Sequence, residues 1–189
     1  SLRVALGGGM AVQQAVAEKW KKITGVTLVE AYGLTETSPA VTINPLDLKA
    51  FDHSIGLPIS STEVSIRDDD GIEQAIGQRG ELCVRGPQVT PGYWNRPEET
   101  AQTLRGGWLH TGDMAFRDGD GYLFIVDRKK EMIIRGGENI YPRELEGVIH
   151  RHPQVMEAAV VGVPDAIYGE EVLACLVLRP GQTLTEEVF

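Results

Sequence analysis

The feature that most limits the fold of this chain is a series of short strands between residues 54 and 127. Apolar and polar residues alternate over residues 63–67, 81–85, 114–117 and 122–126, and Gly and Asp turns separate these segments. Alternation with a period of two is typical of strands that bury one face and are joined by hairpins. The middle of the chain is therefore predicted to form a small, distorted antiparallel β-barrel, interrupted by a short helix at residues 97–104.

The region before this barrel has a different pattern. An apolar strand at residues 2–6 and a glycine break precede apolar residues at helical spacing over residues 12–23. Gly25 is a suitable end for that helix, and a second apolar strand follows at residues 26–31. The order strand, helix, strand favours parallel pairing of the two strands.

The region after the barrel alternates between strand and helix again. A strand leads to Gly136 and Gly137, and a helix from residue 142 to about 151 is followed by apolar strands at residues 155–163 and 171–178. A further helix is expected to begin at residue 185. We therefore predict a mixed α/β and β fold with three parts. These are the end of an α/β subdomain (residues 1–53), the barrel (54–127), and the start of an α+β C-terminal domain (128–189).

Composition excludes some classes of function. The chain carries 18 Lys and Arg against 27 Asp and Glu, a formal charge of −9, which argues against nucleic acid as a partner. Two separate cysteines suggest neither a disulfide framework nor a zinc site, and a cytoplasmic location is the default expectation. The longest apolar runs are much shorter than the ~20 residues that a membrane helix needs, so we expect no transmembrane segment.

Residues 32–37, with the sequence YGLTET, follow a buried strand, where open α/β sheets place their ligands. The hydroxyl of Thr35 beside the carboxylate of Glu36 can serve a phosphate and its Mg²⁺, because this ion prefers oxygen ligands. Spacing alone favours a simpler alternative, in which Thr35 caps a short helix that has Glu36 in its first turn.

Residues 108–113, with the sequence WLHTGD, place Asp113 after a glycine at the start of a strand. A carboxylate can accept hydrogen bonds from the two vicinal hydroxyls of a ribose, although Asp113 can also simply close a turn. His110 is predicted to be a packed or exposed side chain, because no other ligand stands at metal spacing.

The junction between the barrel and the last region gathers the cations Arg128, Lys129 and Lys130, which by themselves are typical of a solvated linker. Gly136 and Gly137 either let a ligand approach the backbone or form a tight turn. The Asp-rich segments at residues 68–71 and 118–121 are predicted to be hairpin turns rather than calcium loops.

The order of these motifs is more specific than any one of them. Gly7 to Gly9, YGLTET, GELCVRGPQVTPGYWNRPEET, GWLHTGD and DRKKEMIIRGGENIYPRELE follow one another along the chain. This succession resembles the adenylate-forming superfamily of acyl-CoA synthetases over nearly the whole chain. The segments at residues 7–20 and 54–71 look most similar to bacterial long-chain fatty acid CoA ligases.

The resemblance implies a two-step reaction and a set of site residues. A carboxylate attacks the α-phosphate of Mg-ATP to give acyl-AMP and pyrophosphate, and the thiol of coenzyme A then displaces AMP. The residues that match the family's motifs imply a nucleotide site. In this site Tyr32 and Gly33 lie at the adenine, and Asp113 and Arg128 lie at the ribose. Thr35 contacts a phosphate, and Glu36 binds Mg²⁺.

Three further groups of residues take roles from the same resemblance. Gly7, Gly8 and Gly9 border the acyl pocket, and Gly136 and Gly137 line the approach of the coenzyme A arm. Lys130 matches the hinge about which the last domain, a lid, rotates between the two half-reactions.

The chain also departs from the family pattern. The family's phosphate loop and the adenylating lysine of its last domain are absent, so we expect the chain to be an inactive fragment of an enzyme that binds a fatty acid or another carboxylate, ATP and coenzyme A. We also expect the fragment to associate with itself, because its first strand, helix, strand unit leaves sheet edges and an apolar face uncovered. Peripheral membrane contact of the complete enzyme is compatible with this interpretation. An aryl- or short-chain acyl-CoA ligase and a non-catalytic binding module on the same scaffold are the alternatives.

Overall fold

The computed structural model describes residues 2–184, and the chain divides into two compact units, Ser1–Ile125 and Val126–Phe189. Each unit is described by itself. The helix that we expected to begin at residue 185 lies outside the described residues. The division into three parts that we drew from the sequence stays a prediction.

The first sheet of the first unit contains the predicted parallel pair. Strand β1 (Ala5–Gly7) pairs with β2 (Leu28–Gly33), and helix α1 (Gln14–Thr24) connects them. Gly25 ends α1 in a left-handed conformation with a φ of 73°, as the sequence predicted. Two strands that we did not predict extend the sheet in antiparallel fashion, β3 (Ala40–Ile43) and β4 (Leu57–Pro58).

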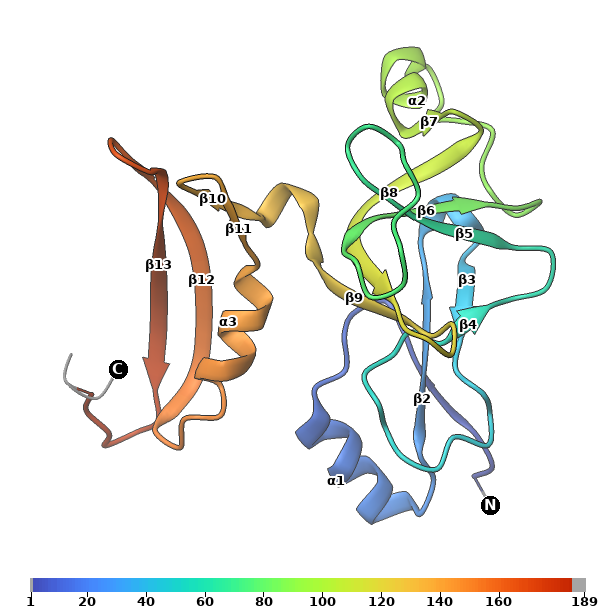
Figure 1. The fold of residues 1–189 in the computed structure, drawn as a ribbon. Coiled ribbons are helices and arrows are strands. Elements are labelled where there is room, and N and C mark those ends of the chain that lie inside the picture. Colours follow the sequence, from blue (N-terminus) through green and yellow to red (C-terminus); the bar gives the residue numbers. More distant parts are fainter. Residues whose placement is uncertain (1, 185–189) are drawn as a thin grey trace. The chain divides into compact units, whose positions relative to one another are not determined.

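The second sheet of this unit is antiparallel and curled into a half-barrel, which confirms the predicted mixed α/β and β fold (Figure 1). Its strands follow the order β5-β6-β8-β7, and β9 pairs with β8. The strands are β5 (Glu63–Arg67), β6 (Gly80–Arg85), β7 (Leu104–Arg105), β8 (Trp108–Arg117) and β9 (Leu123–Arg128), and the short helix α2 (Pro97–Thr103) precedes β7. The last residues of β9, from Val126 on, are counted with the second unit.

A single apolar core joins these two sheets. Val41 of β3 packs with buried residues of the half-barrel, among them Ile66, Leu82, Leu109 and Leu123. The backbone amide of Ile59 also donates to the carbonyl of Val41 at 3.0 Å. The strand β2, which ends in the YGLTET motif, is therefore held at a defined place on the half-barrel.

Both Asp-rich segments of the first unit form turns, as predicted. Asp118 Oδ1 accepts hydrogen bonds from the amides of Asp120 and Tyr122 at 3.0 and 2.8 Å, between the paired strands β8 and β9. Asp68 Oδ1 binds the amides of Asp70 and Ile72 in the same way, at 3.1 and 2.9 Å. In each turn the carboxylate is engaged by the backbone of its own loop.

The second unit is a four-stranded antiparallel sheet in the order β11-β10-β13-β12, with helix α3 (Pro142–Ile149) packed on β12. Glu146 of α3 accepts a 2.9 Å hydrogen bond from the amide of Val160. The strands are β10 (Ile133–Arg135), β11 (Glu138–Ile140), β12 (Val155–Asp165) and β13 (Gly169–Leu178). No helix within residues 2–184 is both long and apolar enough to cross a membrane.

Candidate functional site

Tyr32 and Gly33 form the end of β2 rather than a loop after it, which corrects our placement of the YGLTET motif. Gly33 pairs with Ala40 of β3, and a Cβ atom built at Gly33 would lie 1.6 Å from the carbonyl oxygen of Pro39. Only glycine fits this position. The fold therefore requires glycine at position 33, independently of any contact that Gly33 makes with a ligand.

The segment after β2 is a tight turn closed by Thr37. Residues Thr35–Thr37 form one turn of 3-10 helix, η1, with Leu34 at its N-cap. The buried Thr37 hydroxyl lies 3.0 and 2.9 Å from the carbonyl oxygens of Leu34 and Pro39, which share its single proton, and it accepts from the amide of Leu34 at 2.9 Å. The capping alternative for Thr35 is therefore wrong, and Thr35 itself is exposed.

Glu36 is held by a residue from a distant part of the chain. The hydroxyl of Tyr93, in the loop before α2, donates a 2.7 Å hydrogen bond to Glu36 Oε1, and the amide of Thr90 binds the Glu36 carbonyl at 2.8 Å. The pKa of Tyr93 is raised, first because its hydroxyl donates to the Glu36 carboxylate and also because it is partly buried. The phenol thus keeps its proton and fixes the direction of the Glu36 carboxylate.

Asp113 lies in β8 beside the end of β2. Its side chain is buried, with only 4% of the residue exposed, and its Oδ2 atom accepts a 2.5 Å hydrogen bond from the hydroxyl of Tyr32. These two residues are 81 positions apart in the sequence. The tertiary structure therefore brings together the two motifs that the sequence singled out for a nucleotide.

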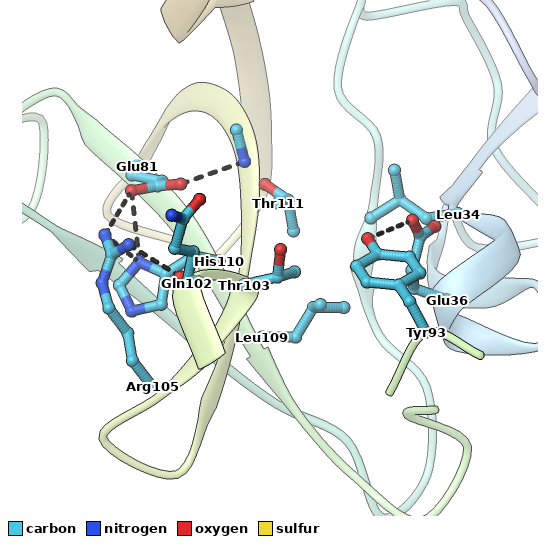
Figure 2. A pocket seen from close by; sticks show the side chains of 11 residues that line it. Leu34, Glu36, Glu81, Tyr93, Gln102, Thr103, Arg105, Leu109, His110 and Thr111 are labelled. Atoms are coloured by element: carbon cyan, nitrogen blue, oxygen red, sulfur yellow. Dashed lines mark hydrogen bonds and ion pairs between the residues drawn. The ribbon is translucent and has the colours of Figure 1, made fainter. Parts of the chain in front are cut away.

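A pocket of about 300 Å³ lies between the same two motifs (Figure 2). Leu34 and Glu36 line it from one side with Tyr93, while Thr111 and Gly112 line it from β8. Figure 2 shows a second polar group on the opposite wall, in which the Glu81 carboxylate meets Arg105, His110 and the backbone amide of Gly112. The pocket thus has a carboxylate on each wall.

Gly7 is the last residue of β1 and pairs with Glu30 of β2, and Gly8 and Gly9 follow it. A Cβ atom at Gly8 would lie 3.0 Å from the carbonyl oxygen of Ala31, the residue before Tyr32. Gly9 adopts a φ of 84°, which favours glycine. Nearby, the buried Glu30 carboxylate accepts a 3.1 Å hydrogen bond from the amide of Val12. The glycines therefore meet the strand that carries Tyr32.

Arg128 and Lys130 belong to the second unit and are both exposed. Lys130 is the middle residue of a second turn of 3-10 helix, η2 (Lys129–Glu131). The buried carboxylate of Asp127 accepts hydrogen bonds from the amides of Arg128 and Arg143 at 2.7 and 3.0 Å. The start of this unit is thereby tied to the first turn of α3.

Gly136 and Gly137 are the two residues of the hairpin turn between β10 and β11. Both have positive φ angles, 60° and 89°, as a type I′ turn requires. The Gly136 amide donates to the Tyr168 carbonyl at 2.9 Å, and the Arg135 guanidinium lies 4.2 Å from the Tyr168 ring. The pKa of Glu171 is lowered, mainly by its 2.6 Å hydrogen bond from Arg135. The turn is exposed, so both glycines are accessible to a ligand.

Sequence reasoning missed Tyr93, Glu81 and Arg105 as residues of the pocket. Of the two alternatives that the sequence left open for His110, packed or exposed, the structure shows a packed side chain, with only 8% of it exposed. Within residues 2–184, no group of three or more His, Cys, Asp or Glu side chains is placed to hold a metal ion.

Two family models match the chain. The model described as AMP-binding enzyme covers residues 1–94, and the model described as AMP-binding enzyme C-terminal domain covers residues 144–189. These matches lie on both sides of the boundary between Ile125 and Val126. The chain therefore contains sequence from both domains of this family.

Individual relatives agree with the family models. A long-chain-fatty-acid–CoA ligase of Yersinia pestis is 54% identical over 100% of this chain, and a feruloyl-CoA synthase of Amycolatopsis is 43% identical over 97% of it. The crystal structure of ATP-bound MatB from Rhodopseudomonas palustris is 36% identical, with a TM-score of 0.90 over 97% of this chain.

The chain spans only 34% of the Yersinia pestis ligase, 38% of the Amycolatopsis synthase and 37% of the MatB chain. It therefore corresponds to about a third of the length of these relatives. The two family models match in the expected order, the relatives are similar over the whole chain, and the fold is shared. The chain therefore belongs to the AMP-binding, adenylate-forming enzyme family.

Proposed function

We propose that this chain supplies part of the nucleotide site and the start of the C-terminal lid of a long-chain fatty acid CoA ligase. The observation that carries the proposal is the hydrogen bond between Tyr32 and Asp113, which unites the two predicted nucleotide motifs beside one pocket. The 54% identity to a long-chain-fatty-acid–CoA ligase supports the choice of substrate class. The enzyme would form acyl-AMP from a fatty acid and ATP and then transfer the acyl group to coenzyme A.

Asp113 is suited to bind the ribose of ATP. An ionised carboxylate has about four lone-pair sites and can accept hydrogen bonds from several donors, here Tyr32 and the vicinal hydroxyls of the sugar. In this proposal Tyr32 and Gly33 lie at the adenine, and Arg128 contacts the sugar or a phosphate. The exposed hydroxyl of Thr35 is available to a phosphate oxygen.

Glu36 is the residue of this chain that we assign to Mg²⁺. Its carboxylate lines the pocket and is oriented by Tyr93, which fits an ion that takes one or two carboxylates and fills its remaining positions with water and substrate phosphates. When bound, the ion would offset the repulsion between the anionic substrates. The protein's own part is to present the carboxylate in a fixed direction.

The remaining assignments concern the acyl group and coenzyme A. By the resemblance to the family, Gly7, Gly8 and Gly9 would border the acyl pocket. A side chain at Gly8 would also crowd the backbone of β2, so the backbone packing favours glycine there. The exposed turn of Gly136 and Gly137 would let the pantetheine arm of coenzyme A approach the backbone closely.

A second candidate is an aryl-CoA ligase, which the 43% identity to a feruloyl-CoA synthase favours. The experiment that separates the two is a panel of fatty and aromatic acids offered to the full-length enzyme, with pyrophosphate release and thioester formation measured separately. Long-chain fatty acids are expected to support both. Activity confined to aromatic acids would select the alternative, and no carboxylate-dependent pyrophosphate release with any acid would refute an acyl-CoA ligase.

The proposed hinge can be tested at Lys130. Proline fixes φ near −65° and restricts the preceding residue, so Lys130→Pro should hold the lid in one orientation, whereas Lys130→Ala removes the charge and leaves the backbone free. We expect the proline variant of the full-length enzyme to form thioester at least about tenfold more slowly than the alanine variant, because closure steps often limit turnover. Equal losses in the two variants would show that Lys130 is not the hinge.

We also propose that the isolated 189-residue chain associates with itself. Large apolar side chains on and near α1 and β1 are exposed, including Leu6, Met10, Val16 and Ile23. Burying apolar area is favourable at about 25 cal/mol per Å². Light scattering is expected to show oligomers at high concentration, and Val16→Lys with Ile23→Lys should reduce them. A stable monomer of the unchanged chain would contradict this expectation.

A cytoplasmic location remains part of the proposal.

A further inference from the structure

The ladder between β6 and β8 is irregular at the place where Asp113 lies. Glu81 pairs with Met114 and Cys83 pairs with His110, so the three residues 111–113 of β8 face the single residue Leu82. Such a bulge changes the direction of the side chains within it and is common beside active sites. The direction of the Asp113 carboxylate therefore depends on what holds the bulge.

The Glu81 carboxylate contacts the middle of this bulge and the residue that precedes it. Its Oε1 accepts a 3.0 Å hydrogen bond from the amide of Gly112, which has a φ of 73°. Its Oε2 lies 3.2 Å from His110 Nδ1 and 3.5 Å from Nη2 of Arg105. Only 6% of the Glu81 side chain is exposed. Since a buried carboxylate is costly unless it is paired, these partners and Glu81 hold one another in place.

The remaining contacts of the bulge lead from Glu81 to the proposed ribose site. The Thr111 hydroxyl donates to the Leu82 carbonyl at 2.7 Å and accepts from the amide of Asp113 at 3.1 Å. The Asp113 carboxylate in turn accepts a 2.5 Å hydrogen bond from the hydroxyl of Tyr32. The bulge is thus tied to β6 through the Gly112 amide and the Thr111 hydroxyl, and Glu81 supplies the charged part of that support.

We propose that Glu81 is a positioning residue, which fixes the bulge of β8 so that the Asp113 carboxylate meets the ribose hydroxyls of the nucleotide. This inference rests on the proposed function, because it takes Asp113 as the ribose ligand. Glu81 itself acts through the backbone of Gly112. Misplacement of a binding group by about 1 Å can cost roughly a hundredfold in rate, so loss of this support should be visible in nucleotide selectivity.

The test measures how strongly the full-length enzyme prefers ATP over 2′,3′-dideoxy-ATP, as the ratio of the two kcat/KM values. Glu81→Ala is expected to lower this preference by between about tenfold and a hundredfold. Glu81→Gln keeps an acceptor for the Gly112 amide and should retain more of the preference. Glu63→Ala is the matched control, because Glu63 is a carboxylate of the same sheet that binds Arg85 on the exposed surface, and it should leave the ratio unchanged.

A double variant separates positioning from general damage. If Glu81 acts through Asp113, Glu81→Ala should lower the preference no further in an Asp113→Ala background, because residues in one network are not additive. Should Glu81→Ala fail to fold, Glu81→Gln and its double variant carry the same test. If the Glu81 variants kept the full preference for ATP over 2′,3′-dideoxy-ATP while Asp113→Ala lost it, this inference alone would be overturned. Full preference in Asp113→Ala would instead remove the ribose assignment and this inference with it.

Discussion

Replacement of Asp113 by alanine is expected to lower kcat/KM for ATP in the full-length enzyme by at least about a hundredfold. Hydrogen bonds to a charged group contribute about 1.5–3 kcal/mol each, and two ribose hydroxyls would lose their acceptor. A loss of 1.4 kcal/mol corresponds to about tenfold, so two such bonds account for this decrease. Steady-state kinetics with varied ATP and isothermal titration with AMP would measure the effect.

The same substitution also removes the acceptor of the Tyr32 hydroxyl, so its effect on stability must be separated from its effect on binding. An unpaired buried polar group costs about 1–3 kcal/mol. Asp113→Asn is the matched control, because its amide oxygen can still accept from Tyr32 while the negative charge is lost. We expect this variant to unfold near the wild-type temperature and still to use ATP poorly. The structure places Asp113 in the middle of β8 rather than at the start of a strand or in a turn. If Asp113→Ala lost stability and bound ATP normally, Asp113 would only support the fold of this strand.

Replacement of Gly33 by alanine is expected to destabilise the first unit by roughly 3 kcal/mol or more, since overpacking a well-packed site costs about 1–3 kcal/mol and sometimes more. The added Cβ atom would lie 1.6 Å from the Pro39 oxygen and 2.6 Å from its carbonyl carbon. Both are backbone atoms, so no side-chain rotation relieves the contact. Strands β2 and β3 would have to separate, and Tyr32 would move with them.

Equilibrium urea unfolding of the full-length protein would measure this loss. Gly119→Ala is the matched control, because a Cβ atom there meets nothing within 4 Å and its backbone does not require glycine. We expect the control to change the free energy of unfolding by less than about 0.5 kcal/mol. Equal stability of the two variants would mean that β2 and β3 adjust more easily than the contact indicates.

Much of the local structure could be predicted from the sequence, because it depends on neighbouring residues. The three helices begin and end close to their predicted bounds, since helical spacing, Gly25 and the prolines at residues 97 and 142 act locally. The parallel pairing of β1 with β2 followed from the order of the elements. The family followed from the order of five motifs.

The tertiary structure decided which side chains meet. Glu81 and His110 lie on strands whose pairing includes a bulge, and a shift of register cannot be read from the alternation of either strand alone. Tyr93 reaches Glu36 across 57 positions of the sequence. Strand β3 was missed because its pairing with β2 depends on distant contacts, and its residue Val41 is buried by the half-barrel. Local sequence therefore determined the elements and motifs, and long-range packing determined how Asp113 and Glu36 are held.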